Sequence, residues 1–118
     1  MEYRITARTS GMAIDMPRAD WVGLMILAEQ ESYYFQPPEL ISHTKALEIA
    51  EALTKVLPDL PAERHDMAAP DPLGTATPES GWSKKNALGR FGGENRVVVE
   101  KFIELCEQEG DLEVSRLP

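Results

Sequence analysis

The chain has 118 residues, enough to fold as one domain around a core that needs neither disulfides nor metal. Its formal net charge of −8 disfavours nonspecific binding to nucleic acid or anionic lipid, because like charges repel. The single cysteine, Cys106, excludes an intrachain disulfide and suits a reducing compartment.

Neither an export signal nor a membrane span is expected. Residues 1–8 lack the apolar stretch of a signal peptide. The longest apolar run, residues 22–28, is far shorter than the ~20 residues that a bilayer requires. We therefore expect a soluble, cytoplasmic protein.

The first residues predict a β-hairpin. Apolar side chains alternate with others from Tyr3 to Ala7 and again from Met12 to Met16, which is the period of half-buried strands. Gly11 lies between the two segments and can adopt the positive φ of a tight turn.

Residues 20–28 are predicted to form the centre of the core. Pro17 fits the first turn of a helix, and the apolar side chains that follow fall on every side of it. A buried strand is the alternative, but the polar flanks extend the segment beyond normal strand length. We therefore expect a helix that is buried on several sides.

A one-sided helix is predicted next. Ser42 is a suitable N-cap, and the apolar residues from Ala46 to Leu57 share one face, opposite Glu48 and Glu51. Pro58 is expected to end this helix.

The last part of the chain predicts a helix and a strand. Apolar residues from Val98 to Cys106 recur on one face, and Gly110 suits the C′ position behind the helix. Leu112 and Val114 then alternate with polar residues, which predicts a final strand that can pair with the hairpin.

Residues 58–93 are predicted to be a long irregular loop, because they hold five of the nine prolines and five of the eight glycines. We expect residues 60–80 to be mobile or loosely packed. The whole chain, residues 1–118, then forms one α+β domain in which a small antiparallel sheet packs against three helices.

Three segments resemble, in order and character, small bacterial proteins of unknown function. They are residues 21–28, residues 46–53, and residues 102–106 with Gly110 behind them. The resemblance rests mostly on core positions and covers about half of the chain. It implies a bacterial origin and supplies no catalytic residues.

Residues 81–96 are the strongest candidate for a ligand site. They are locally basic, and their glycines precede a helix N-terminus, where free N–H groups attract anions. The spacing matches neither a dinucleotide fingerprint nor a Walker A loop. The simpler interpretation, which we favour, is that aromatic side chains anchor this loop and that Glu94 satisfies the helix end. The candidate ligand-binding residues are Trp82, Lys84, Lys85, Arg90, Gly92, Gly93 and Arg96.

A cluster of aromatic residues is the candidate protein interface. Tyr33, Tyr34 and Phe35 precede two prolines, and aromatic side chains dominate binding hot spots. The simpler interpretation is that the three rings cap the core as the chain turns.

The sequence predicts neither a metal or cofactor site nor a catalytic group. His43 and His65 are the only histidines, and no metal-ligand spacing surrounds them. Cys106 lies on an apolar helix face, which indicates a buried, unreactive thiol. Nucleophile motifs of hydrolases and β-lactamases are also missing.

The exposed faces of the second and last predicted helices are acidic. They carry Glu48 and Glu51, then Glu100, Glu104 and Glu107. We expect a non-enzymatic interaction or regulatory module, similar in role to an inhibitor or immunity protein, with a basic protein partner. The alternative is a binder or enzyme for a small phosphate or carboxylate that uses the loop before Asn95.

Overall fold

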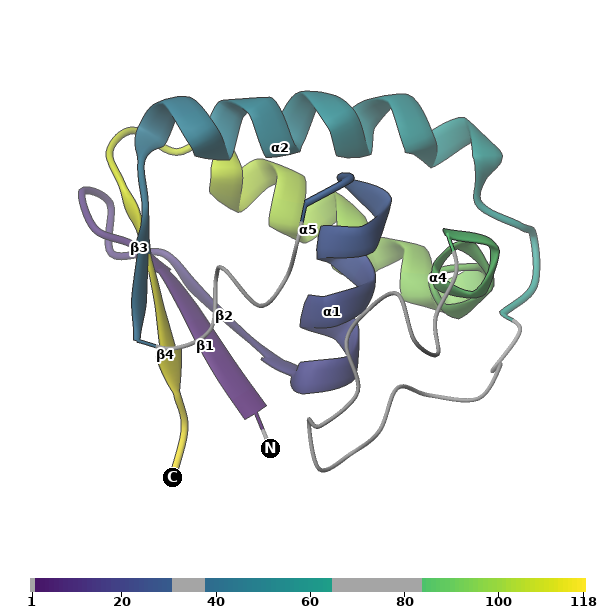
Figure 1. The fold of residues 1–118 in the computed structure, drawn as a ribbon, viewed down its shortest axis with the longest axis horizontal. Coiled ribbons are helices and arrows are strands. Elements are labelled where there is room, and N and C mark those ends of the chain that lie inside the picture. The colour runs from purple at the N-terminus through teal and green to yellow at the C-terminus, as the bar shows by residue number, and fades with distance from the viewer. Residues whose placement is uncertain (1, 31–37, 65–83) are drawn as a thin grey trace.

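The structure is a computed structural model that describes residues 2–30, 38–64 and 84–118 (Figure 1). They form a small antiparallel sheet with helices packed against it, which confirms the predicted α+β class. No helix among the described ranges is long and apolar enough to cross a membrane.

Within the described ranges, four antiparallel strands make the sheet in the order β2-β1-β4-β3. They are β1 (Glu2–Ala7), β2 (Ala13–Pro17), β3 (Glu39–Ile41) and β4 (Leu112–Arg116). The predicted hairpin is confirmed, since β1 pairs with β2 and Gly11 has a φ of +80° in the turn. The predicted final strand is also confirmed, because β4 pairs with β1.

One face of the sheet is buried and the other is open to solvent. Ile5 and Val114 are opposite one another and fully buried, whereas the neighbouring Arg4 and Glu113 are exposed. On the open face, Arg4 Nε lies 2.7 Å from Asp15 Oδ1 across the β1–β2 pair. The hydrogen bond from this guanidinium lowers the pKa of Asp15 below its usual value.

Helix α1 (Arg18–Leu27) is the centre of the core, as predicted for residues 20–28. Almost every residue of this segment is buried, and Trp21 packs edge-on against Phe102 of α5 with ring centroids 5.8 Å apart. In Figure 1, α1 stands between the sheet and α4, with α2 passing over one end. The helix therefore supplies apolar surface to several neighbours at once.

Helices α2 (His43–Val56) and α5 (Arg96–Cys106) pack against one another and confirm both one-sided predictions. Ser42 caps α2 as expected, because its Oγ accepts a hydrogen bond from the Lys45 N–H at 3.2 Å. A short 3₁₀ turn, η2 (Leu57–Asp59), follows α2 and contains Pro58.

Three local features differ from the predictions. Strand β3 was not predicted. Helix α4 (Lys84–Arg90) lies inside the range that was predicted to be irregular, of which residues 65–83 fall outside the described residues. Gly110 is not a C′ residue, because the C-cap of α5 is Glu107. Its φ of +92° instead serves the turn that leads into β4.

Candidate functional site

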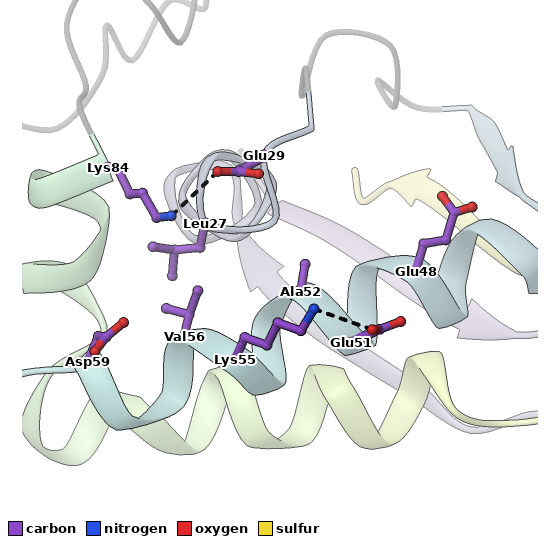
Figure 2. Close-up of a pocket in the computed structure, with 9 residues that line it drawn as sticks. All are labelled: Leu27, Glu29, Glu48, Glu51, Ala52, Lys55, Val56, Asp59 and Lys84. Carbon is purple, nitrogen blue, oxygen red and sulfur yellow. Dashed lines mark ion pairs between the residues drawn. The ribbon is translucent and has the colours of Figure 1, made fainter.

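A cleft of about 480 Å³ lies where α1, α2 and α4 meet (Figure 2). Its apolar lining consists of Leu27 from the end of α1 and of Ala52 and Val56 from α2. Figure 2 shows Leu27 and Val56 pointing toward one another across this space. The volume falls within the ~300–1,000 Å³ that is usual for ligand pockets.

Acidic side chains dominate the polar lining of the cleft. Four carboxylates and two ammonium groups line it: Glu29, Glu48, Glu51, Asp59, Lys55 and Lys84. Both lysines are engaged at the rim, where Lys55 Nζ lies 3.4 Å from Glu51 and Lys84 Nζ lies 3.6 Å from Glu29. These pairs are solvent-exposed and therefore weak.

The last residues of two helices also line the cleft. Helix α1 ends at Leu27 and α2 ends at Val56, and both residues line the cavity. The last carbonyl groups of a helix carry partial negative charge, which favours nearby cations. The short helix α4 begins at the rim with Lys84, whose ammonium group opposes this effect. The balance of formal charge around the cleft remains negative.

The predicted basic loop is held by internal contacts. Arg90 Nε donates a hydrogen bond to Asp20 Oδ1 at 2.6 Å, and the two side chains are only 15% and 9% exposed. This buried ion pair joins the C-terminal end of α4 to the first turn of α1. It gives Arg90 a structural role in the fold.

The two glycines of the loop pack against residues 61–63. A Cβ on Gly92 would collide with the Glu63 carbonyl oxygen and approach Pro61 Cγ to 2.7 Å. The Gly93 N–H donates to the Pro61 carbonyl at 3.1 Å, and the Asn95 N–H donates to the Gly92 carbonyl at 3.1 Å. These backbone groups are therefore already engaged within the protein.

The remaining predicted site residues are dispersed. Arg96 begins α5 with its side chain exposed and lies 3.8 Å from Glu100, while Lys84 is at the cleft. Lys85 belongs to α4, but its side chain is not described. Trp82 and the aromatic cluster of Tyr33, Tyr34 and Phe35 lie outside the described residues.

Cys106 is fully buried, in agreement with its predicted structural role. Burial, with a smaller contribution from the charge of Glu107, raises its pKa to about 12. The backbone N–H of His43 donates to Asp111 Oδ1 at 3.0 Å, and His65 lies outside the described residues. In the described ranges, no three His, Cys, Asp or Glu side chains are grouped to hold a metal ion.

Searches of protein-family models, curated proteins and solved structures found no match to this chain. Sequence reasoning identified Glu48 and Glu51 as an acidic face but missed the cleft beside them. The only available signal was the helical spacing of Glu48, Ala52 and Val56, which places the three side chains along one side of α2.

Proposed function

We propose that this protein is a non-enzymatic interaction or regulatory module, of the inhibitor or immunity type, that binds a basic protein partner. The observation that carries the proposal is the exposure of every carboxylate on the two acidic helix faces. These residues are Glu48, Glu51, Glu100, Glu104 and Glu107.

The charges on these faces are only partly compensated. Lys45, Lys55 and Arg96 form exposed pairs at 3.4–3.8 Å with Glu48, Glu51 and Glu100, respectively. Such pairs contribute little and are easily exchanged for others. With a net charge of −8, the protein would attract a basic partner over long range, which raises the rate of association.

Affinity capture tests this proposal. The tagged chain, used as bait with chemical cross-linking in cell extract, is expected to retain one or a few proteins of high pI, identified by mass spectrometry. Capture should fall steeply as ionic strength rises above the physiological value, because screening weakens exposed charges. Capture of acidic proteins only, or retention that salt does not change, would contradict it.

Binding of a small phosphate or carboxylate at the loop before Asn95 remains the alternative. It has less support, because Asp20 already engages Arg90 and backbone acceptors already engage the Gly93 and Asn95 N–H groups. Arg96 is the exposed base at the start of α5. Titration with inorganic phosphate, followed by the amide shifts of residues 92–97, tests it. Shifts that Arg96→Ala abolishes would favour this alternative.

A further inference from the structure

We propose that the cleft between α1, α2 and α4 is the docking site for a cationic, partly apolar polypeptide segment of the partner. This inference rests on the proposed function and gives it a location. Its occupant is a segment that inserts a Lys or Arg side chain and brings apolar residues beside it.

The composition of the cleft selects this chemistry. Leu27, Ala52 and Val56 provide apolar surface for the aliphatic part of a long side chain, while carboxylates stand at the rim. Lysine and arginine bury their methylene groups on apolar surface and keep the charged end beside polar groups. A purely apolar ligand would add no partner for Asp59, and an anion would meet a cleft whose formal charge is negative.

The electrostatic setting points the same way from two independent sources. One is the excess of carboxylates, among which Asp59 has neither a hydrogen bond nor an ion pair with any described residue. The other is that Leu27 and Val56, the last residues of α1 and α2, both line the cleft, so the negative ends of two helix dipoles lie near it. Both favour a positive charge at the same place.

Another exposed apolar side chain lies on α2 outside the lining of the cleft. Leu47, one turn before Glu51 on α2, is 43% exposed and is one of the three large apolar side chains exposed in the described ranges. A segment with a basic residue in the cleft and an apolar residue at helical or extended spacing can contact both. Interfaces commonly combine an apolar contact with a charged rim in this way.

Peptide titration of the ¹⁵N-labelled full chain provides the test. The probe is a short peptide of alternating Leu and Lys, compared with a peptide in which Ser replaces each Leu and with one in which Glu replaces each Lys. We expect saturable binding of the Leu/Lys peptide, with the largest amide shifts at Leu27, Ala52 and Val56. The other two peptides should bind at least about tenfold more weakly.

A matched pair of variants locates the site. Glu48→Gln/Glu51→Gln/Asp59→Asn removes three carboxylates from the cleft, and Glu100→Gln/Glu104→Gln/Glu107→Gln removes three from α5. All six side chains are exposed, so both variants are expected to fold. The cleft variant should weaken binding about tenfold or more, and the α5 variant less than about threefold.

Three results would overturn the inference. They are equal weakening by the two variants, equal binding of the Ser/Lys peptide, and failure of the wild-type chain to bind the Leu/Lys peptide. If the α5 variant alone lost binding, the cleft would be wrong as the site while the proposed binding of a basic partner would stand. If the tagged wild-type chain captured no basic protein in a salt-sensitive manner from extract, that result would instead count against the proposed function.

Discussion

At the scale of single residues, the pair of Asp20 and Arg90 stands apart from the other ion pairs. It is nearly buried, and it connects α4 to α1 at a separation of 70 residues in the chain. The Asp20 carboxylate also lies in the first turn of α1, where the helix dipole favours negative charge. The pair therefore fixes the position of α4 and of the loop that follows it.

Asp20→Asn is expected to lower the free energy of unfolding by about 3 kcal/mol, because it removes a negative charge from beside a largely buried guanidinium. Urea denaturation followed by circular dichroism measures the change. Asp15→Asn, which breaks the exposed pair with Arg4, is the control and should cost much less. Equal losses in the two variants would show that burial adds nothing to the Asp20–Arg90 pair.

Cys106 makes stability sensitive to alkali. The folded-state pKa of its thiol, about 12, lies above the ordinary thiol value. The protonated thiol therefore makes its full contribution to the free energy of unfolding when the pH is below that ordinary value. As pH rises from there toward 12, the unfolded chain releases the thiol proton first and the free energy of unfolding falls. Urea titrations between pH 8 and 10.5 should show this slope, and Cys106→Ala should reduce it.

The burial of Cys106 also predicts that a thiol reagent labels the protein only after unfolding. Rapid labelling without denaturant would contradict the assigned burial.

At the scale of secondary-structure elements, α2 is anchored at its start by two oxygen acceptors from different parts of the chain. Ser42 accepts from the Lys45 N–H and is a local cap. Asp111 accepts from the His43 N–H and reaches α2 from the turn before β4. The second cap therefore ties the helix to the sheet.

Ser42→Ala and Asp111→Ala are each expected to cost about 1 kcal/mol, because each leaves an N–H of the first helical turn without its side-chain acceptor. Thermal denaturation of the two variants and of the double variant measures this. Thr44→Ala, at an exposed position of the same turn with no capping contact, is the control. The prediction fails if the caps cost no more than this control.

The two edge strands are poorly suited to pair with another chain. Alternate residues of β2, including Pro17, direct their backbone N–H and C=O positions away from β1. Proline has no N–H to donate to a further strand. On β3, the Leu40 N–H is already occupied by Glu39 Oε1 at 3.1 Å. These features favour the helical side of the molecule over the sheet edges as the surface for a partner.

Most elements could be predicted because their signals are local. The alternation of Tyr3, Ile5 and Ala7 and the helical spacing from Val98 to Cys106 each lie within one continuous segment. Strand β3 was missed because its three residues are too few to show a period, and α4 was missed because seven residues with Gly89 near the end have a weak helical signal.

The cleft could not be predicted from the sequence. Its lining comes from three separate segments, at residues 27–29, 48–59 and 84. The acidic face of α2 was visible in the sequence, but the end of α1 that faces it was not. Only the tertiary packing of α1 against α2 and α4 joins these segments.

At the scale of the whole molecule, β1 is the most enclosed strand. It pairs with β2 on one side and β4 on the other, and its inward side chains are fully buried. Strand β3 has three residues and a single partner. Stability is therefore expected to be distributed unevenly across the sheet.

Native-state hydrogen exchange measures this distribution. The amides of β1 are expected to exchange only through global unfolding, and those of β3 through local opening with a lower free energy. The amide of Ile5 serves as the reference for β1 and that of Ile41 for β3. Equal protection at Ile5 and Ile41 would contradict the expected hierarchy.

The antiparallel pairing of β1 with β4 also brings the two ends of the chain together, as Figure 1 shows. The Leu117 N–H donates to the Glu2 carbonyl at 2.9 Å, so residues 2 and 117 are direct neighbours. A short linker could therefore join these positions, and new ends could be opened at the exposed turn of the hairpin. Tension applied between residues 2 and 117 would load the backbone hydrogen bonds between β1 and β4 one at a time, so this strand pair would open at low force.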